Sequence, residues 1–233
     1  MRLAIFSDPH ANLQALERCL AEARRRGATA YGCCGDIVGY GGSPTQTLDL
    51  VRSVCDVVVQ GNHDEAVAAD GEIAVLPVDG VAAALAHREA LSSADRDWLR
   101  GLPLRAEAHG CTFVHAAPSE PAAWLRLGSF RLLREQFAHF ETDLCFVGHS
   151  HVPAVAAEKF GVSSVRPGER YLIDVGSVGQ PRDGDPRASF ALLDTETGAF
   201  ESVRVGYDVD GAAAAIRAAG LPETLAARLY AGR

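Results

Sequence analysis

The sequence predicts an α/β fold with parallel strands, and three observations support this prediction. Short apolar runs alternate with helical patterns through the first half of the 233-residue chain, which is the rhythm of strand–helix–strand units. Apolar residues make up 48% and charged residues 22% of the chain, a composition typical of globular proteins with a sizeable core. No linker, repeat or low-complexity segment divides the sequence, so we expect a single domain over residues 1–233.

The expected elements follow from apolar periodicity and from residues that start or stop helices. Strands are expected at 3–6, 30–34, 55–59, 112–115, 144–147, 171–175, 188–194 and 200–205. Helices are expected near 13–26, 44–53, 78–102, 122–140 and 211–219, with a last helical piece after Pro222. Pro44 directly after Ser43 is typical of a first helical turn, and 195–198 is typical of a turn between two strands.

Charge, hydropathy and cysteine usage narrow the class of protein. The formal net charge is -8, so we do not expect a nucleic-acid polymer as the partner. No apolar run reaches the length of about 18 residues that a membrane span needs, and the N-terminus becomes polar at Ser7, too early for a signal peptide. The six cysteines form no Cys-x-x-Cys pair, which favours buried reduced thiols. We therefore expect a cytoplasmic protein, whose oligomeric state the sequence leaves open.

Polar residues with metal-binding chemistry stand directly after several of the expected strands. They are Asp8, His10, Asp36, Asn62, His63, Asp64, His115, His149 and His151. Ligands bind at the carboxyl ends of parallel strands, so we expect five successive strands to deliver these groups to one sheet edge. Glycines at 35, 61 and 148 suit the tight turns that carry them.

The chemistry of this set predicts two divalent metal ions. Carboxylate oxygen and imidazole nitrogen are ligands for manganese, iron, zinc, nickel or cobalt, and a shared aspartate can bridge two ions roughly 3.5–4 Å apart. Four positive charges against two aspartates leave a net positive site that attracts phosphate. A bound water then has a lowered pKa and yields hydroxide near neutral pH.

The motifs, taken in order, resemble the calcineurin-like metallophosphoesterases. The matching motifs are Asp8-x-His10, Gly35-Asp36, Gly61-Asn62-His63-Asp64, His115 and Gly148-His149-Ser150-His151. The resemblance covers residues 3 to about 194, and the stretches 35–41 and 174–183 are similar to small bacterial and archaeal members of phosphodiesterase type. It implies a two-sheet β-sandwich flanked by helices, with the second sheet drawn from strands after about Val152.

The resemblance also implies a role for each motif residue. It implies that Asp8, His10 and His151 hold the first metal, that Asn62, His115 and His149 hold the second, and that Asp36 bridges both. It implies that His63 is the general acid or charge stabiliser at the leaving oxygen, and that Asp64 orients His63 by a hydrogen bond. The loop 176–183 is expected beside the metals, where its amides or Arg182 meet the substrate phosphate. Manganese is the expected metal, with iron, zinc, nickel and cobalt as alternatives.

Some residues depart from the pattern or have a simpler explanation. Pro9, Ala11 and Asp174 replace residues that are common in the family, but none of them removes a proposed ligand. His87, His109 and His139 lie outside the motifs, and we expect structural roles for them. Trp124 is expected in the core, whereas Tyr40 and Arg182 fit substrate contact and surface equally well.

The sequence thus predicts a metal-dependent hydrolase that cleaves a phosphodiester or phosphomonoester by metal-activated hydroxide. We expect the substrate to be small, phosphorylated and nucleotide-like. One alternative is a protein serine/threonine phosphatase, which an open groove over the metals would favour. Another is a non-catalytic scaffold or regulatory protein on the same fold, for which missing ligands or a missing His63 would be the signature.

Overall fold

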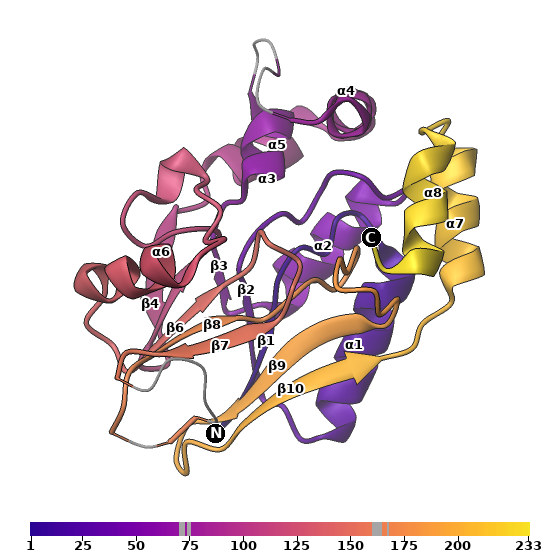
Figure 1. The fold of residues 1–233 in the computed structure, drawn as a ribbon. Helices are drawn as coiled ribbons and strands as arrows, with labels where there is room; N and C mark the ends of the chain where they lie inside the picture. Colours follow the sequence, from indigo (N-terminus) through magenta and orange to yellow (C-terminus); the bar gives the residue numbers. More distant parts are fainter. Residues whose placement is uncertain (70–72, 74–75, 160–164, 167) are drawn as a thin grey trace.

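A computed structural model describes residues 1–69, 73, 76–159, 165, 166 and 168–233. Two five-stranded sheets stack face to face, and helices cover their outer faces (Figure 1). The strands are β1 (Arg2–Phe6), β2 (Ala30–Cys33), β3 (Val57–Val58), β4 (Arg105–Ala108), β5 (Cys111–Val114), β6 (Leu144–Val147), β7 (Ala154–Ala157), β8 (Tyr171–Asp174), β9 (Ala188–Asp194) and β10 (Phe200–Val205). This is the two-sheet sandwich that the sequence motifs imply.

Both sheets are mixed, and each contains three parallel strands. The first sheet has the order β10-β9-β1-β2-β3, in which β1, β2 and β3 run parallel and β9 pairs antiparallel with β1. The second has the order β4-β5-β6-β8-β7, in which β5, β6 and β8 run parallel and the edge strands β4 and β7 run antiparallel. The carboxyl ends of the parallel strands carry the loops that concern function.

Successive side chains of a strand point alternately to the two faces of its sheet, and this divides the apolar core into layers. In β1, Leu3 and Ile5 belong to the apolar cluster between the sheets, together with Phe113 and Phe146 of the second sheet. The intervening Ala4 and Phe6 belong to a different cluster, packed against the helices. A strand that is buried on both sides therefore reads as a continuous apolar run.

The helices lie outside this sandwich and over one of its ends (Figure 1). They are α1 (Leu13–Arg25), α2 (Pro44–Val54), α3 (Asn62–Ala68), α4 (Val78–Ala90), α5 (Ser93–Arg100), α6 (Phe130–Glu135), α7 (Val209–Ala218) and α8 (Glu223–Ala231), with short 3-10 turns η1 (Pro121–Ala123) and η2 (Gln136–His139). Within the described residues, no helix is long and apolar enough to cross a membrane.

Three structural expectations need correction. The second sheet does not draw only on strands after Val152, because β9 and β10 join the first sheet and β4, β5 and β6 belong to the second. The segment 122–140 is not one helix: it contains η1, a non-helical stretch, α6 and η2, and Ser129 caps α6 through its side chain. The edge strands β4 and β7 and the helix α3 were not predicted, because each is short and lacks a clear apolar period.

Candidate metal centre

Loops from both sheets meet at one end of the sandwich and carry the motif residues. Asp8 and His10 follow β1, and Asp36 follows β2. Asn62 and His63 open α3, just after β3. His115 follows β5, whereas His149 and His151 follow β6. The expectation of a single sheet edge is therefore wrong in one respect: the groups converge from the carboxyl-end edges of two stacked sheets.

Five of these residues have an unusual backbone conformation. Asp8, His10, Asp36, His149 and His151 all have positive φ, between 46° and 65°. Side chains other than glycine rarely adopt this left-handed region, and such strain concentrates at functional sites. Tertiary contacts that hold the loops in this form also fix the directions of the five side chains.

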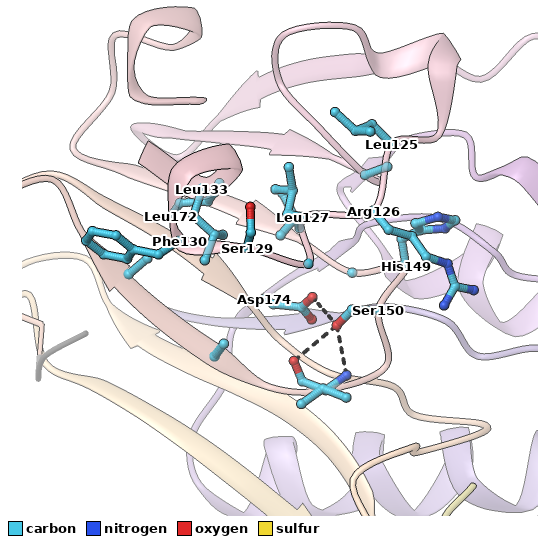
Figure 2. A pocket seen from close by; sticks show the side chains of 17 residues that line it. Leu125, Arg126, Leu127, Ser129, Phe130, Leu133, His149, Ser150, Leu172 and Asp174 are labelled. Carbon is cyan, nitrogen blue, oxygen red and sulfur yellow. Dashed lines mark hydrogen bonds between the residues drawn. The ribbon is translucent and has the colours of Figure 1, made fainter. Parts of the chain in front are cut away.

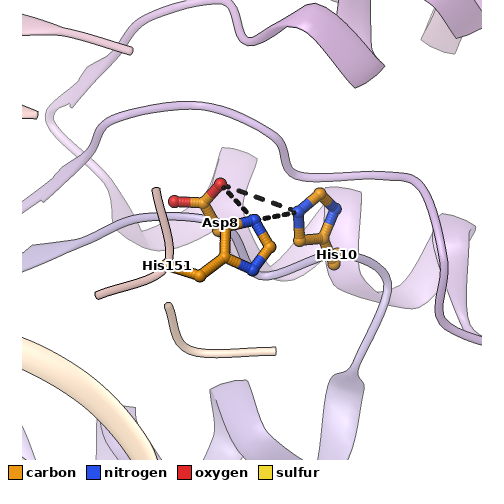
Figure 3. A group of neighbouring side chains, drawn as sticks. All are labelled: Asp8, His10 and His151. Carbon is orange, nitrogen blue, oxygen red and sulfur yellow. Dashed lines mark hydrogen bonds and ion pairs between the residues drawn. The ribbon is translucent and has the colours of Figure 1, made fainter. Parts of the chain in front are cut away.

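A first cluster consists of Asp8, His10 and His151 (Figure 3). The Nε2 atoms of His10 and His151 are 3.1 Å apart. Asp8 Oδ1 lies 3.1 Å from His151 Nε2 and 3.6 Å from His10 Nε2. All three residues are at most 2% exposed, so water does not screen their mutual interactions.

Backbone carbonyls fix the outward-facing nitrogens of this cluster. His10 Nδ1 donates to Val38 O at 3.0 Å, and His151 Nδ1 donates to Gln180 O. In the neutral rings both Nε2 atoms then present lone pairs to one another. Asp8 Oδ1, beside them, accepts no hydrogen bond. Buried acceptors that face each other without a donor are costly, and a cation between them satisfies all three, so the cluster fits a divalent metal.

A second cluster consists of Asp36, His115 and His149. His115 Nε2 lies 3.3 Å from Asp36 Oδ2 and 3.2 Å from His149 Nδ1. His115 Nδ1 donates to Cys34 O at 2.7 Å, which orients the ring. Asn62 adds a buried Oδ1 atom that has no hydrogen-bond partner. This cluster also contains the donor types that a divalent metal requires.

Asp36 stands between the two clusters. Its Oδ2 atom lies 3.6 Å from His10 Nε2 and 3.3 Å from His115 Nε2. Its Oδ1 atom accepts the backbone N–H of His63 at 2.8 Å, which holds the carboxylate in place. One oxygen is thus turned toward both sets of imidazoles. This is the arrangement expected of a carboxylate that bridges two ions.

Electrostatics favours the charge states that metal binding needs at Asp8, Asp36, His149 and His151, but not at His115. Burial opposes ionisation of Asp8, but His151 and its neighbours outweigh burial and hold the pKa of that carboxyl well below its usual range. Burial likewise opposes ionisation of Asp36, and His115 lowers the pKa of this carboxyl all the same. Burial lowers the pKa of His149 and of His151 to about 4, which leaves both rings neutral near pH 7. Burial disfavours a charged His115, yet Asp36 raises its pKa to about 10, so a proton and a cation compete for its Nε2.

His63 reaches the clusters, but Asp64 does not orient it. The His63 ring lies 4.9 Å from that of His10, centroid to centroid, and one of its nitrogens lies within reach of His10 and Asp36. Its Nδ1 atom is buried without a hydrogen-bond partner. Asp64 instead accepts backbone N–H groups from residues 37, 38 and 61, at 2.9, 3.2 and 3.0 Å. The predicted hydrogen bond from Asp64 to His63 is therefore wrong, because this carboxylate caps α3 and fixes the loop after β2.

Two glycines allow these loops to approach one another. A Cβ atom on Gly61 would clash with Asp36 Oδ1, and one on Gly148 would clash with Asp8 Oδ2. These two oxygens accept backbone N–H groups and hold the two aspartate carboxylates in place, so both carboxylates occupy space that any other residue at 61 or 148 would fill. The sequence predicted that these glycines serve tight turns, whereas the structure shows that they are needed because a side chain would not fit beside the aspartates.

A cavity of about 280 Å³ opens over the two clusters. It is lined by Asp36, Asn62, His63, His149 and His151, and also by Tyr40, Leu76, Pro77, Ala123, Trp124, Arg126 and Arg182. The loop 176–183 lies against the first cluster as expected, but its amides at 178 and 179 donate to Ser7 O and Asp8 O. They therefore brace that cluster, whereas the Arg182 side chain reaches the cavity.

The arrangement of buried imidazoles and carboxylates agrees with the chain's similarity to known proteins. The family profile described as the calcineurin-like phosphoesterase superfamily domain matches residues 1–198. The chain belongs to the calcineurin-like phosphoesterase superfamily. It is 36% identical over 241 residues to an uncharacterized protein from Methanocaldococcus jannaschii, covering 99% of this chain and 98% of that protein.

Two solved structures share the fold of this chain. A metallophosphoesterase from Sphaerobacter thermophilus is 36% identical and superposes with a TM-score of 0.89, over 100% of this chain and 99% of that one. A hypothetical protein from Pyrococcus horikoshii, 23% identical, superposes with a TM-score of 0.83 over 100% and 98% of the two chains. Helices α7 and α8 lie beyond the matched superfamily domain, which ends at residue 198.

Several residues around the calcineurin-like site were missed or misread from the sequence. Trp124 is not in the core: it is half-buried, lines the cavity and donates from Nε1 to Glu65 Oε2 at 2.9 Å. Tyr40 packs its ring 4.4 Å from that of His63, centroid to centroid, and Arg182 lies over the Tyr40 ring. Glycines on both sides of Tyr40 were the one available signal that this loop approaches other backbone closely.

The histidines outside the motifs lie outside both clusters, and His87 has a clear structural task. It accepts the Gly39 N–H at Nδ1 (3.0 Å) and donates from Nε2 to Gly41 O (2.9 Å). The loop that carries Tyr40 is thereby pinned to α4. Among the departures from the family pattern, Ala11 takes a positive φ of 50°, where glycine would be unstrained. All six cysteines are free thiols, and five of them are buried.

Proposed function

We propose that this protein is a metal-dependent hydrolase that cleaves phosphate esters at a dinuclear centre. The observation that carries the proposal is Asp36, whose Oδ2 atom lies within 3.6 Å of an imidazole from each cluster. Two ligand sets that share one carboxylate suit two ions at the spacing used in phosphoryl-group hydrolysis. Membership of the calcineurin-like superfamily supports the same reaction class.

In this proposal the chain holds its metals through seven side chains. Asp8, His10 and His151 hold the first ion, Asn62, His115 and His149 hold the second, and Asp36 holds both. Manganese is the preferred ion, and iron, zinc, nickel and cobalt suit the same nitrogen and oxygen donors. The ions would neutralise phosphate charge and lower the pKa of a water so that hydroxide is available near neutral pH.

The chain's own side chains position the ester. His63 lines the cavity beside Asp36, and we assign it to the leaving oxygen as general acid or charge stabiliser. Arg182 lines the same cavity and meets a phosphate oxygen. Asp64 has a positioning role, because it accepts two backbone N–H groups of the loop after β2 and one N–H group just before α3, and so ties these two segments together.

The volume of the cavity favours a small substrate over a phosphoprotein. Trp124, Leu76 and Pro77 border the space over the clusters, whose volume of about 280 Å³ is near that of ordinary small-molecule sites. A nucleotide-like substrate suits it, because the Trp124 ring offers a face to a base. The scaffold alternative is disfavoured, because His63 and every proposed ligand reach the same site. We also propose a single-domain, cytoplasmic protein.

The proposal is tested by hydrolysis of bis-p-nitrophenyl phosphate and p-nitrophenyl phosphate. Metal-stripped protein should be inactive, and added manganese should restore turnover. His63→Ala should keep its metals but lower kcat by about 10²–10⁴-fold. His139→Ala is the matched control, because this exposed histidine lies away from the cavity. Unchanged turnover in His63→Ala would remove the general-acid assignment, and metal-independent turnover would overturn the proposal.

A further inference from the structure

A second cavity, of about 340 Å³, adjoins the candidate metal centre and has a different character (Figure 2). Its walls are largely apolar and include Leu125, Leu127, Phe130, Leu133 and Leu172. These side chains come from the segment before α6, from α6 itself and from β8. The volume falls in the range of ordinary small-molecule sites, which are mostly apolar with a few polar groups.

Small residues leave this space open. Ala154 and Ala156 lie on the same face of the edge strand β7 and line the cavity. Phe130 is 54% exposed and Leu125 38% exposed, although both border an apolar space. Apolar side chains that are left this accessible beside a cavity gain from covering by an apolar ligand.

Two residues connect the cavity with the metal centre. His149 and Arg126 line both this cavity and the one over the two clusters. In Figure 2 both stand at one end of the apolar cavity, whereas Phe130 and Leu172 stand toward the other. A molecule whose phosphate lies at the two clusters can therefore extend past His149 into the apolar space.

Polar groups occur on the floor of the cavity, but they are already engaged. Asp174 accepts Ser150 Oγ at 2.6 Å and the Gly176 N–H at 2.9 Å. Ser150 Oγ also lies 3.0 Å from the Val152 N–H that it accepts. With these groups paired inside the protein, the cavity offers apolar contact more than hydrogen bonds to an occupant.

The position of His63 decides which part of a substrate lies here. His63 lines the cavity over the clusters and not the apolar one, so the group beside His63 is the one that leaves. We infer that the apolar cavity binds the ester group that stays on phosphorus, and that the substrate is a phosphodiester whose retained arm is an aliphatic or aromatic hydrocarbon group. This inference rests on the proposed function and adds the substrate class.

The reaction on such a diester is a simple displacement. A water oxygen forms a new bond to phosphorus and gives up one proton, and the bond between phosphorus and the leaving oxygen breaks. The leaving oxygen takes up one proton at His63 and departs as an alcohol, or departs as a phenolate while the proton from water goes to solvent. The apolar arm remains esterified, so the second product is a phosphate monoester with its hydrocarbon group still in the cavity.

The test is a chain-length series of methyl, butyl and hexyl p-nitrophenyl phosphates with the manganese-loaded enzyme. Each added methylene that enters the cavity should raise kcat/KM by roughly two- to fourfold, the value of a buried methylene. Hexyl should therefore exceed methyl by roughly 30-fold or more. Equal kcat/KM across the series would overturn the inference.

Two variants locate the effect. Ala154→Phe fills the cavity from an exposed edge-strand position, and Phe130→Ser makes one exposed wall polar. Both should keep the turnover of the methyl ester and lose most of the gain with chain length. Ala218→Phe is the matched control, because Ala218 is exposed on α7 and lines none of the described cavities. A chain-length gain that survives both cavity variants would place the apolar arm elsewhere and overturn the inference.

A binding measurement separates this inference from the proposed function. Hexylphosphonate and methylphosphonate, which are not hydrolysed, are titrated calorimetrically into the manganese-loaded protein. The hexyl compound should bind more tightly than the methyl compound, and Ala154→Phe should abolish this difference. That result supports the apolar site even where no ester is turned over. Equal binding of the two phosphonates, in a protein that hydrolyses the methyl ester, would retain the proposed function and refute the apolar site.

Discussion

Changing His87 to glutamine should flatten the acid dependence of the protein's stability. His87 is 2% exposed and hydrogen-bonded to the backbone at Gly39 and Gly41. Burial lowers its pKa to about 4 in the folded protein, whereas an unfolded histidine titrates near 6.5. Between pH 6.5 and pH 4 this histidine is protonated in the unfolded chain but mostly neutral in the folded chain. The free energy of unfolding therefore decreases as the pH falls through this range.

The size of the effect follows from the two pKa values. Near pH 7.5 both states are neutral at this position, and the imidazole contributes almost nothing to the pH dependence. At pH 5 the unfolded state is protonated and the folded state is still mostly neutral, which costs the wild type about 2 kcal/mol of unfolding free energy. Glutamine does not titrate, so its own packing cost is the same at both pH values.

The assay is urea unfolding of metal-free wild type and His87→Gln at pH 7.5 and pH 5. Metal-free protein is used because the release of ions in acid would add its own pH dependence. The fall in unfolding free energy between the two conditions should be about 2 kcal/mol smaller in the variant. An equal decrease in unfolding free energy in the two proteins would refute the conclusion that His87 is a buried neutral residue that holds the Tyr40 loop.

Three further substitutions test the site. Asp36→Ala should lose both metals while the fold persists. Metal analysis checks the occupancy, and far-ultraviolet circular dichroism checks the fold. Full metal occupancy would contradict the bridging role. Gly61→Ala should lower the affinity for manganese by about 10–100-fold, because the added Cβ displaces Asp36 Oδ1. Calorimetric titration with manganese measures this affinity. Unchanged affinity would show that the loop relaxes around the added Cβ and would contradict the prediction. Trp124→Ala should raise KM for a dinucleotide by about fivefold or more through lost stacking, whereas Trp124→Phe should not, and equal KM values would exclude a base at this ring.

The candidate site was largely predictable from the sequence because its residues directly follow strands. Asp8, Asp36 and His115 each stand one to three residues beyond a strand end, and ligands of α/β sheets bind beyond the carboxyl ends of the strands. The role of Asp64 was not predictable in this way. Its partners are backbone amides at 37, 38 and 61, and only the assembled loops show that they surround it.

The parts of the fold that sequence reasoning misplaced depend on long-range pairing or on local breaks. β9 joins β1 through Leu3 opposite Leu193, 190 residues later in the chain, and no local pattern specifies that partner. In 122–140 an apolar helical pattern was overridden, because Trp124 adopts a left-handed conformation and Ser129 starts a new helix. That break turns Trp124 toward the cavity and makes it a candidate contact for substrate.

The most direct test of the central claim is the manganese content of the purified protein. Wild type saturated with manganese, freed of excess ion and analysed by plasma mass spectrometry should contain two manganese ions per chain. Asp36→Ala, prepared in the same way, should contain well under one. Two ions in the wild type and their joint loss in the variant would support a dinuclear centre bridged by Asp36; a wild-type ratio of one or less at saturation would contradict it.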